Sequence, residues 1–210
     1  MQIAQHINAE LYQGDIPEEF LNLARKIGLV AWDIETSGLD WRTEQLAVCQ
    51  LYVPNHPVVV VQSCDCQPIR LPQLLADKDV KKIFHHAMFD LRFLVSNWQV
   101  VPQNIACTKI MAKLLDKDNT QKQTLQSLLK SHLNIVISKS QQRSNWFSSN
   151  LTTQQLDYAV KDVIFLPNLL IELEKEVKNR DLLSLTYSCF AHIPTRTLLD
   201  VLEYDDVYTY

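Results

Sequence analysis

The sequence has no apolar run long enough to cross a bilayer as a helix, which needs about 20 consecutive apolar residues. The first 20 residues also lack a basic region followed by an apolar segment, so we expect no signal peptide. Internal repeats and low-complexity linkers are absent as well. A hydrophobic content of 47% and a charged content of 21% are ordinary for a globular protein. These features predict a single cytoplasmic α/β domain over residues 1–210, with no membrane association and no obligate protein partner.

A cysteine pattern for zinc is also missing. Among the five cysteines, Cys64 and Cys66 are closer together than the usual Cys-x-x-Cys spacing, so we expect reduced thiols. The net charge of −4 does not indicate a general nucleic-acid binder. Positive charge is nonetheless concentrated locally, because Lys109, Lys113 and Lys117 recur at the spacing of one helix face. This stripe is either a solvated face or a row of phosphate contacts.

The sequence does contain five β-rich segments, which span residues 29–35, 45–53, 57–62, 80–86 and 104–109. Helical spacing follows at 89–98 and 124–133, and residues 134–150 are polar and loop-like. The capping-box pair Thr152 and Gln155 predicts a long helix with one apolar stripe, and Pro167 predicts a kink just after Asp162. One more helix and an acidic tail are expected from residue 181 onward. Together these elements predict an α/β fold with a mixed sheet.

Acidic residues occur where apolar segments would not require them. Asp33 and Glu35 end a buried strand and, being two residues apart, point to the same face. Asp90 begins an apolar helix, and Tyr158 and Asp162 share a helix face at spacing i, i+4. Taken singly, each has a structural explanation, such as a solvated strand end, a charge at a helix N-terminus or a local hydrogen bond.

One arrangement accounts for all four acids. Like charges held close together repel, and burial makes each of them costlier. Divalent cations such as Mg²⁺ take oxygen ligands, and two such ions about 3.5–4 Å apart stabilise both the attacking and the leaving oxygen of a phosphoryl transfer. The acids therefore predict a site for two Mg²⁺ or Mn²⁺ ions.

The order of "DIET", "HHAMFD" and "YAVKD" resembles the exonuclease motifs of the DEDD superfamily, in its tyrosine-containing subgroup. The segment from residue 139 to 169, with its Ser-x-x-x-Ser-x-Trp pattern, is similar to the third-motif region of ribonuclease D. The resemblance covers residues 28–177, followed by a short helical acidic extension. It implies an RNase H-like fold with a central mixed five-stranded sheet flanked by helices. It also implies removal of single nucleotides from RNA 3′ ends as nucleoside 5′-monophosphates.

The resemblance also implies roles for individual residues. Asp33 would bridge the two metal ions, Glu35 and Asp162 would complete the site of the nucleophilic water, and Asp90 would hold the second ion. Tyr158 would position the attacking water rather than remove its proton, since an unperturbed phenol has a pKa of about 10. The catalytic set implied is Asp33, Glu35, Asp90, Tyr158 and Asp162.

The expected substrate contacts lie around this set. The backbone near Thr36 and Leu39 would hold the 3′-terminal nucleotide. His86 either lines the substrate groove or is a buried, hydrogen-bonded histidine. Trp146 lies in a polar loop three residues after Arg143, and we expect it to stack on a base.

The sequence departs from the ribonuclease D pattern in two places, and two other functions remain as alternatives. Asn145 stands where ribonuclease D commonly has Asp, so any role of that acid is lost. Too few residues follow residue 177 for an accessory helical domain, so we do not expect strong binding of structured RNA. Nothing in the motifs reads the 2′-hydroxyl, so a DNA 3′-5′ exonuclease remains an alternative. A non-catalytic nucleic-acid-binding module is the other.

Overall fold

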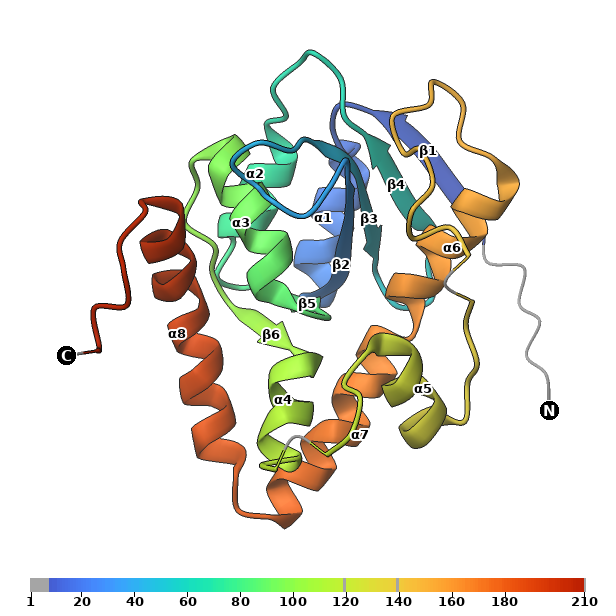
Figure 1. Ribbon diagram of the computed structural model, residues 1–210. Helices are drawn as coiled ribbons and strands as arrows, with labels where there is room; N and C mark the ends of the chain where they lie inside the picture. The colour runs from blue at the N-terminus through green and yellow to red at the C-terminus, as the bar shows by residue number, and fades with distance from the viewer. Residues whose placement is uncertain (1–7, 119, 139, 210) are drawn as a thin grey trace.

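The computed structural model describes residues 8–118, 120–138 and 140–209. At its centre is a mixed sheet with strand order β1-β4-β3-β2-β5-β6 (Figure 1). The antiparallel pairs are β2–β3 and β3–β4, and the parallel pairs are β1–β4, β2–β5 and β5–β6. The strands are β1 (Ala9–Gln13), β2 (Leu29–Thr36), β3 (Leu46–Tyr52), β4 (Val58–Gln62), β5 (Lys81–Phe84) and β6 (Ile105–Cys107). The predicted mixed α/β architecture is confirmed.

The strand count differs from the prediction, because the described residues form six strands and the sequence predicts five. The additional strand, β1, has the sequence Ala-Glu-Leu-Tyr-Gln and lies at the edge of the sheet. Its side chains bury little surface, and Leu11 is 45% exposed. The apolar alternation that identifies a half-buried strand is therefore weak, and backbone pairing with β4 fixes its position. Polar side chains on such an edge disfavour pairing with another chain.

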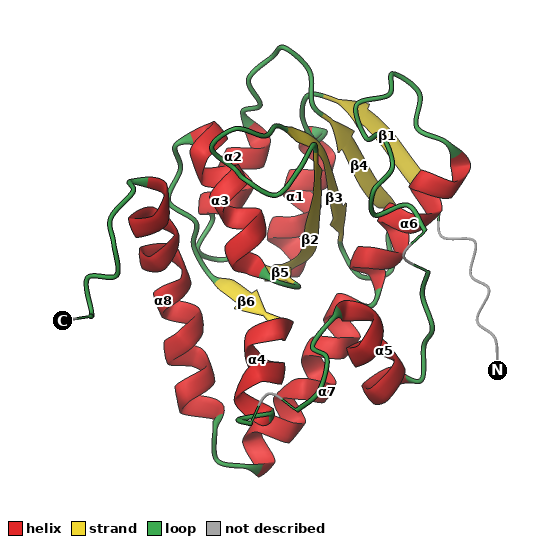
Figure 2. Ribbon diagram, in the orientation of Figure 1, coloured by secondary structure: helices red, strands yellow, loops and turns green. Residues whose placement is uncertain are grey.

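Helices surround the sheet (Figure 2). They are α1 (Glu18–Ile27), α2 (Arg70–Ala76), α3 (Ala87–Trp98), α4 (Thr108–Leu115), α5 (Leu125–Leu133), α6 (Thr153–Ile164), α7 (Leu166–Asn179) and α8 (Leu183–Val201). Helix α6 contacts β1, β2, β3 and β4, and α8 lies along α3 (Figure 1). Strand β4 is buried throughout and β3 nearly so, as expected for strands covered on both faces. In the described part of the chain, no helix has the length and apolar character needed to cross a membrane.

The predicted long helix is two helices. The capping box forms as expected, because Thr152 Oγ1 accepts a hydrogen bond from the Gln155 N–H at 3.2 Å and Gln155 Oε1 accepts one from the Thr152 N–H at 3.0 Å. Helix α6 then ends at Ile164, and α7 begins at Leu166 with Pro167 in its first turn. The break thus falls two residues after the predicted kink, and proline at a helix start has no N–H to leave unpaired.

The predicted C-terminal helix is α8, and Asp200 in its last turn has two arginine partners. The Asp200 carboxylate lies 2.6 Å from Arg92 Nη2 on α3 and 2.8 Å from Arg196 Nη2. The lysine stripe is shorter than predicted, since α4 ends at Leu115 and Lys117 lies beyond it.

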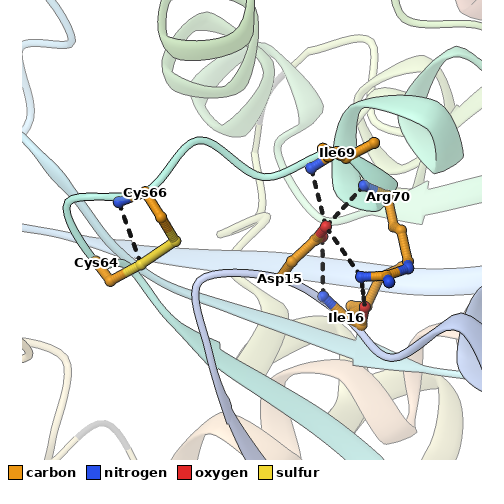
Figure 3. The surroundings of a disulfide bond; sticks show 6 residues. All are labelled: Asp15, Ile16, Cys64, Cys66, Ile69 and Arg70. Carbon is orange, nitrogen blue, oxygen red and sulfur yellow. Dashed lines mark hydrogen bonds and ion pairs between the residues drawn. A yellow bond between two sulfur atoms is a disulfide. The ribbon is translucent and has the colours of Figure 1, made fainter.

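The loop between β4 and α2 contradicts the expectation of reduced thiols, because Cys64 and Cys66 form a disulfide (Figure 3). Their Cα atoms are 5.3 Å apart, within the range that permits the bond. Nearby, Asp15 accepts hydrogen bonds from the backbone N–H groups of Ile69, Arg70 and Leu71 at 2.8–3.0 Å. A side chain remote in sequence therefore caps the N-terminus of α2.

Candidate active site

Two of the predicted acids lie on β2, a central strand of the sheet. Asp33 and Glu35 project to one face, and their carboxylate oxygens lie within 4.8 Å of each other and of an Asp162 oxygen. Glu35 is 8% exposed. The pairing of β2 with β3 shifts register between Glu35 and Thr36, so the strand becomes irregular immediately after the second acid. The two acids are thus presented where the regular ladder ends.

The third acid, Asp90, lies in the first turn of α3 and is 2% exposed. Burial raises the pKa of its carboxyl well above the usual range, while backbone hydrogen bonds from Asp90 and Ile34 and the charge of Lys109 act in the opposite direction. Its Oδ2 atom is buried without a hydrogen-bond partner among the described residues. A buried, unpaired carboxylate oxygen is costly, so this acid is not explained by packing.

The fourth acid comes from α6. Tyr158 and Asp162 are one helical turn apart, and the phenol is hydrogen-bonded to the Asp162 carboxylate. Burial and the charges of Asp162, Glu35 and Asp33 raise the pKa of Tyr158 far above its usual value. The phenol therefore keeps its proton, which fits a group that orients a neighbour rather than a base.

The acids perturb one another strongly. Burial, followed by the charges of Asp90, Asp162 and Glu35, raises the pKa of Asp33 well above its usual value. Burial and the charges of Asp162 and Asp90 raise the pKa of Glu35 from 4.5 to about 9. Gln50, whose amide donates a hydrogen bond to Asp33, lowers the pKa of both residues. Such mutually repelling carboxyls are typical of functional sites, because structure alone does not require them.

The donor set fits a hard divalent cation. Three carboxylates offer oxygens within 4.8 Å of one another, and Asp90 on α3 is close enough for its charge to raise the pKa of both Asp33 and Glu35. Mg²⁺ and Mn²⁺ prefer such ligands, and their charge would relieve the repulsion described above. Asp33, Glu35 and Asp162 are the residues that could hold the metal, with Asp90 as the fourth acid.

The residues expected to contact substrate lie on several elements: Thr36 and Leu39 at the end of β2, His86 before α3 and Arg143 before α6. The Thr36 hydroxyl donates to the Gly38 carbonyl at 2.6 Å, and Leu39 beyond it is 84% exposed. His86 precedes α3 in the left-handed backbone conformation, with φ of 82°, and its exposed ring stacks on Phe89, so it is not the buried histidine of the alternative expectation. Partial desolvation, with the charges of Lys109 and Lys113, lowers the pKa of His86 to about 4. Arg143 is exposed in the loop before α6.

The prediction for Trp146 is wrong. This side chain is 2% exposed, and its ring packs against Tyr158 with centroids 6.0 Å apart, so it supports the phenol instead of a base. The polar loop is held inward by two buried glutamines. Gln155 Nε2 donates to the Asn145 carbonyl at 3.0 Å, and Gln62 Nε2 donates to the Ser148 carbonyl at 3.0 Å. The backbone carbonyls of Asn145 and Ser148, on either side of Trp146, are thus hydrogen-bonded by protein side chains rather than by solvent.

Sequence reasoning also missed Gln50, whose Nε2 donates to Asp33 Oδ2 at 2.8 Å. Gln50 is 0% exposed and lies opposite Asp33 in the β2–β3 ladder. The sequence did contain a signal for this contact, because Gln50 is one amide within the apolar run of β3. A buried polar side chain needs a hydrogen-bond partner, so a partner on a neighbouring strand was to be expected.

A mixed sheet with acids at the end of a central strand, faced by tyrosine and aspartate one helical turn apart, defines a nuclease-type α/β protein of RNase H-like fold. The chain belongs to the 3′-5′ exonuclease family, whose model matches residues 9–178. It is 32% identical to ribonuclease D of Haemophilus influenzae over 161 residues, which are 76% of this chain and 39% of that protein. The chain spans about two fifths of the length of the curated relatives it matches.

Solved structures agree with this assignment. Brucella melitensis NrnC is 30% identical with a TM-score of 0.87, and the match covers 97% of this chain and 98% of NrnC. NrnC has also been solved with bound Mg²⁺ and with pGG. Escherichia coli RNase D, 20% identical with a TM-score of 0.77, shares the fold over 90% of this chain and 50% of its own. The predicted resemblance to ribonuclease D-like DEDD exonucleases is confirmed.

Proposed function

We propose that this chain is a divalent-metal-dependent 3′-5′ exoribonuclease that releases nucleoside 5′-monophosphates. The observation that carries the proposal is the acid cluster, in which oxygens of Asp33, Glu35 and Asp162 lie within 4.8 Å of one another. A non-catalytic binding module has no use for such a closely spaced, partly buried group of carboxyls. The Mg²⁺ bound by the related NrnC supports the choice of cation.

In the proposed reaction, water attacks the 3′-terminal phosphodiester. The bond between phosphorus and the O3′ of the preceding nucleotide breaks, the phosphate stays on the released nucleotide, and the leaving O3′ gains a proton. Divalent ions held by Asp33, Glu35, Asp162 and Asp90 would stabilise the charge that develops on the phosphate and favour ionisation of the attacking water. Tyr158 keeps its proton and orients that water through its hydroxyl.

The substrate contacts belong to the same proposal. Thr36 and Leu39 lie directly after the acids of β2, and they would hold the terminal nucleotide. His86 and Lys109 come from elements beside Asp90, and Lys109 is close enough for its charge to lower the pKa of both His86 and Asp90. A cation beside the acids favours the phosphate-contact interpretation of the lysine stripe. Exposed Arg143 is a further candidate for phosphate contact.

The proposed substrate is single-stranded RNA with a free 3′ end, in the cytoplasm. The likeness to NrnC extends over nearly all of both chains, and NrnC binds pGG, so dinucleotides are included. DNA is the rival substrate, because no described side chain is committed to a 2′-hydroxyl.

The test uses matched RNA and DNA oligonucleotides labelled at the 5′ or the 3′ end, together with pGG, each with Mg²⁺ or Mn²⁺. We expect 5′-labelled RNA to shorten one nucleotide at a time and 3′-labelled RNA to release labelled mononucleotide at once. Asp33→Asn serves as the inactive control. Faster shortening of DNA than of RNA would reassign the substrate to DNA. Binding of RNA without cleavage in either metal would refute the proposed exonuclease activity.

A further inference from the structure

The strand next to the acids carries a buried amide that the proposed reaction does not use. Gln50 lies in β3, which runs antiparallel beside β2 (Figure 1), and it pairs with Asp33 across the ladder. Its side chain is 0% exposed within a strand whose other residues are mainly apolar. An amide in such a position is unfavourable unless it is hydrogen-bonded.

The hydrogen bonds of Gln50 are directional. Nε2 donates to Asp33 Oδ2 at 2.8 Å, whereas Oε1 is buried with no hydrogen-bond partner among the described residues. When a metal ion is bound, Asp33 is an ionised carboxylate that only accepts hydrogen bonds, so the amide must turn its NH₂ toward it. The side chain therefore satisfies the acid and leaves its own carbonyl oxygen unsatisfied. Packing would favour an apolar residue here, so the contact with Asp33 is the feature that distinguishes glutamine.

We propose that Gln50 is a positioning residue that holds the Asp33 carboxylate in its metal-binding orientation. The inference rests on the proposed function, because it assigns Asp33 to the metal. Gln50 lies in a rigid β ladder and fixes one oxygen of Asp33, so rotation of the carboxylate is restricted. The other oxygen is thereby held toward the metal site. Groups that orient metal ligands in this way typically contribute about 10–100-fold to metal affinity.

A matched comparison tests this. Gln50→Met keeps the length and approximate volume of the side chain and removes the N–H donor to Asp33. Gln50→Leu also removes the donor but has a different shape. The control is Gln123→Leu, because Gln123 is 8% exposed and its Nε2 also donates to a carboxylate, that of Asp116, at 2.8 Å, outside the acid cluster. Mn²⁺ affinity is measured by calorimetry without RNA, and melting temperature is measured in metal-free buffer.

We expect both Gln50 variants to bind Mn²⁺ about 10–100-fold more weakly than wild type, with a metal-free melting temperature that is unchanged or higher. At limiting Mn²⁺ their kcat should fall, and saturating Mn²⁺ should restore most of it while KM for RNA stays the same. Gln123→Leu should retain wild-type affinity for Mn²⁺. A lower melting temperature with wild-type Mn²⁺ affinity in the Gln50 variants would make Gln50 merely structural and overturn the inference. A wild-type protein that neither binds Mn²⁺ nor cleaves RNA would refute the proposed function instead.

Discussion

Glu35→Gln should stabilise the metal-free protein at neutral and alkaline pH. In the folded state the pKa of Glu35 is raised from 4.5 to about 9, so between these values the folded protein binds more protons than the unfolded chain. A raised carboxyl pKa contributes stability that is fully present below 4.5 and is lost as pH rises toward 9. Replacing the carboxyl with an amide removes this loss.

The size of the effect follows from the pKa shift. Each pH unit above the unfolded value costs about 1.4 kcal/mol, so at about pH 7.5 the cost approaches ~4 kcal/mol. Because Asp33, Asp90 and Asp162 share the repulsion, the single change should recover about half of it, ~2 kcal/mol. For a chain of this size that corresponds to a rise in Tm of about 4–8 °C.

Differential scanning fluorimetry in chelator-treated buffer, from about pH 4.5 to about pH 8, measures this. The gap between Glu35→Gln and wild type should open as pH rises and close at the acidic end. Added Mg²⁺ or Mn²⁺ should stabilise wild type more than the variant, since a ligand that binds only the folded state stabilises it by mass action. Glu19→Gln, at an exposed position on α1, is the control. A variant that melts at or below the wild-type temperature throughout this range would contradict the mutual repulsion of the acids.

Three further predictions concern other residues. Tyr158→Phe should lower kcat by about 10²-fold with unchanged Tm and unchanged stabilisation by metal, because only the water-orienting hydroxyl is lost; full activity in a destabilised protein would make Tyr158 a packing residue. Trp146→Ala should cost about 3–5 kcal/mol in urea unfolding, whereas a stacking residue would leave stability unchanged and raise KM. Asp15→Ala should cost about 1–2 kcal/mol by the same measurement through loss of the α2 cap, and an unchanged unfolding midpoint would refute the capping role.

The local patterns of the sequence predicted those parts of the fold that depend on local chemistry. Strand alternation placed Asp33 and Glu35 on one face, and helical spacing placed Tyr158 beside Asp162, because both relations are properties of the chain itself. The capping box at Thr152 is likewise local. Strand β1 was missed because its position depends on backbone pairing with β4, to which its side chains contribute little.

The failure at Trp146 has a different physical cause. The loop that carries it is polar, which normally indicates exposure to solvent. Its polar groups are instead satisfied by Gln155 from α6 and Gln62 from β4, 10 and 86 residues away from their loop partners. No local pattern reveals such pairing. The disulfide between Cys64 and Cys66 was missed because cysteine spacing and an expected compartment do not describe the path of the loop.

The position of Asp90 shows how the fold brings together acids that are far apart in sequence. Strand β5 pairs with β2 from Leu29 to Ala31, so β2 extends beyond its neighbour toward the acids. In that extension the backbone of Ile34, between Asp33 and Glu35, lies close enough to the Asp90 carboxyl to lower its pKa. The short length of β5 thus lets α3 begin early and place its first turn against the backbone of β2. The strand that carries the first two acids therefore also positions the third. Lengthening β5 by one more ladder pair would displace the first turn of α3 and with it Asp90. The end of β5 therefore determines the geometry of the site as much as the acids themselves do.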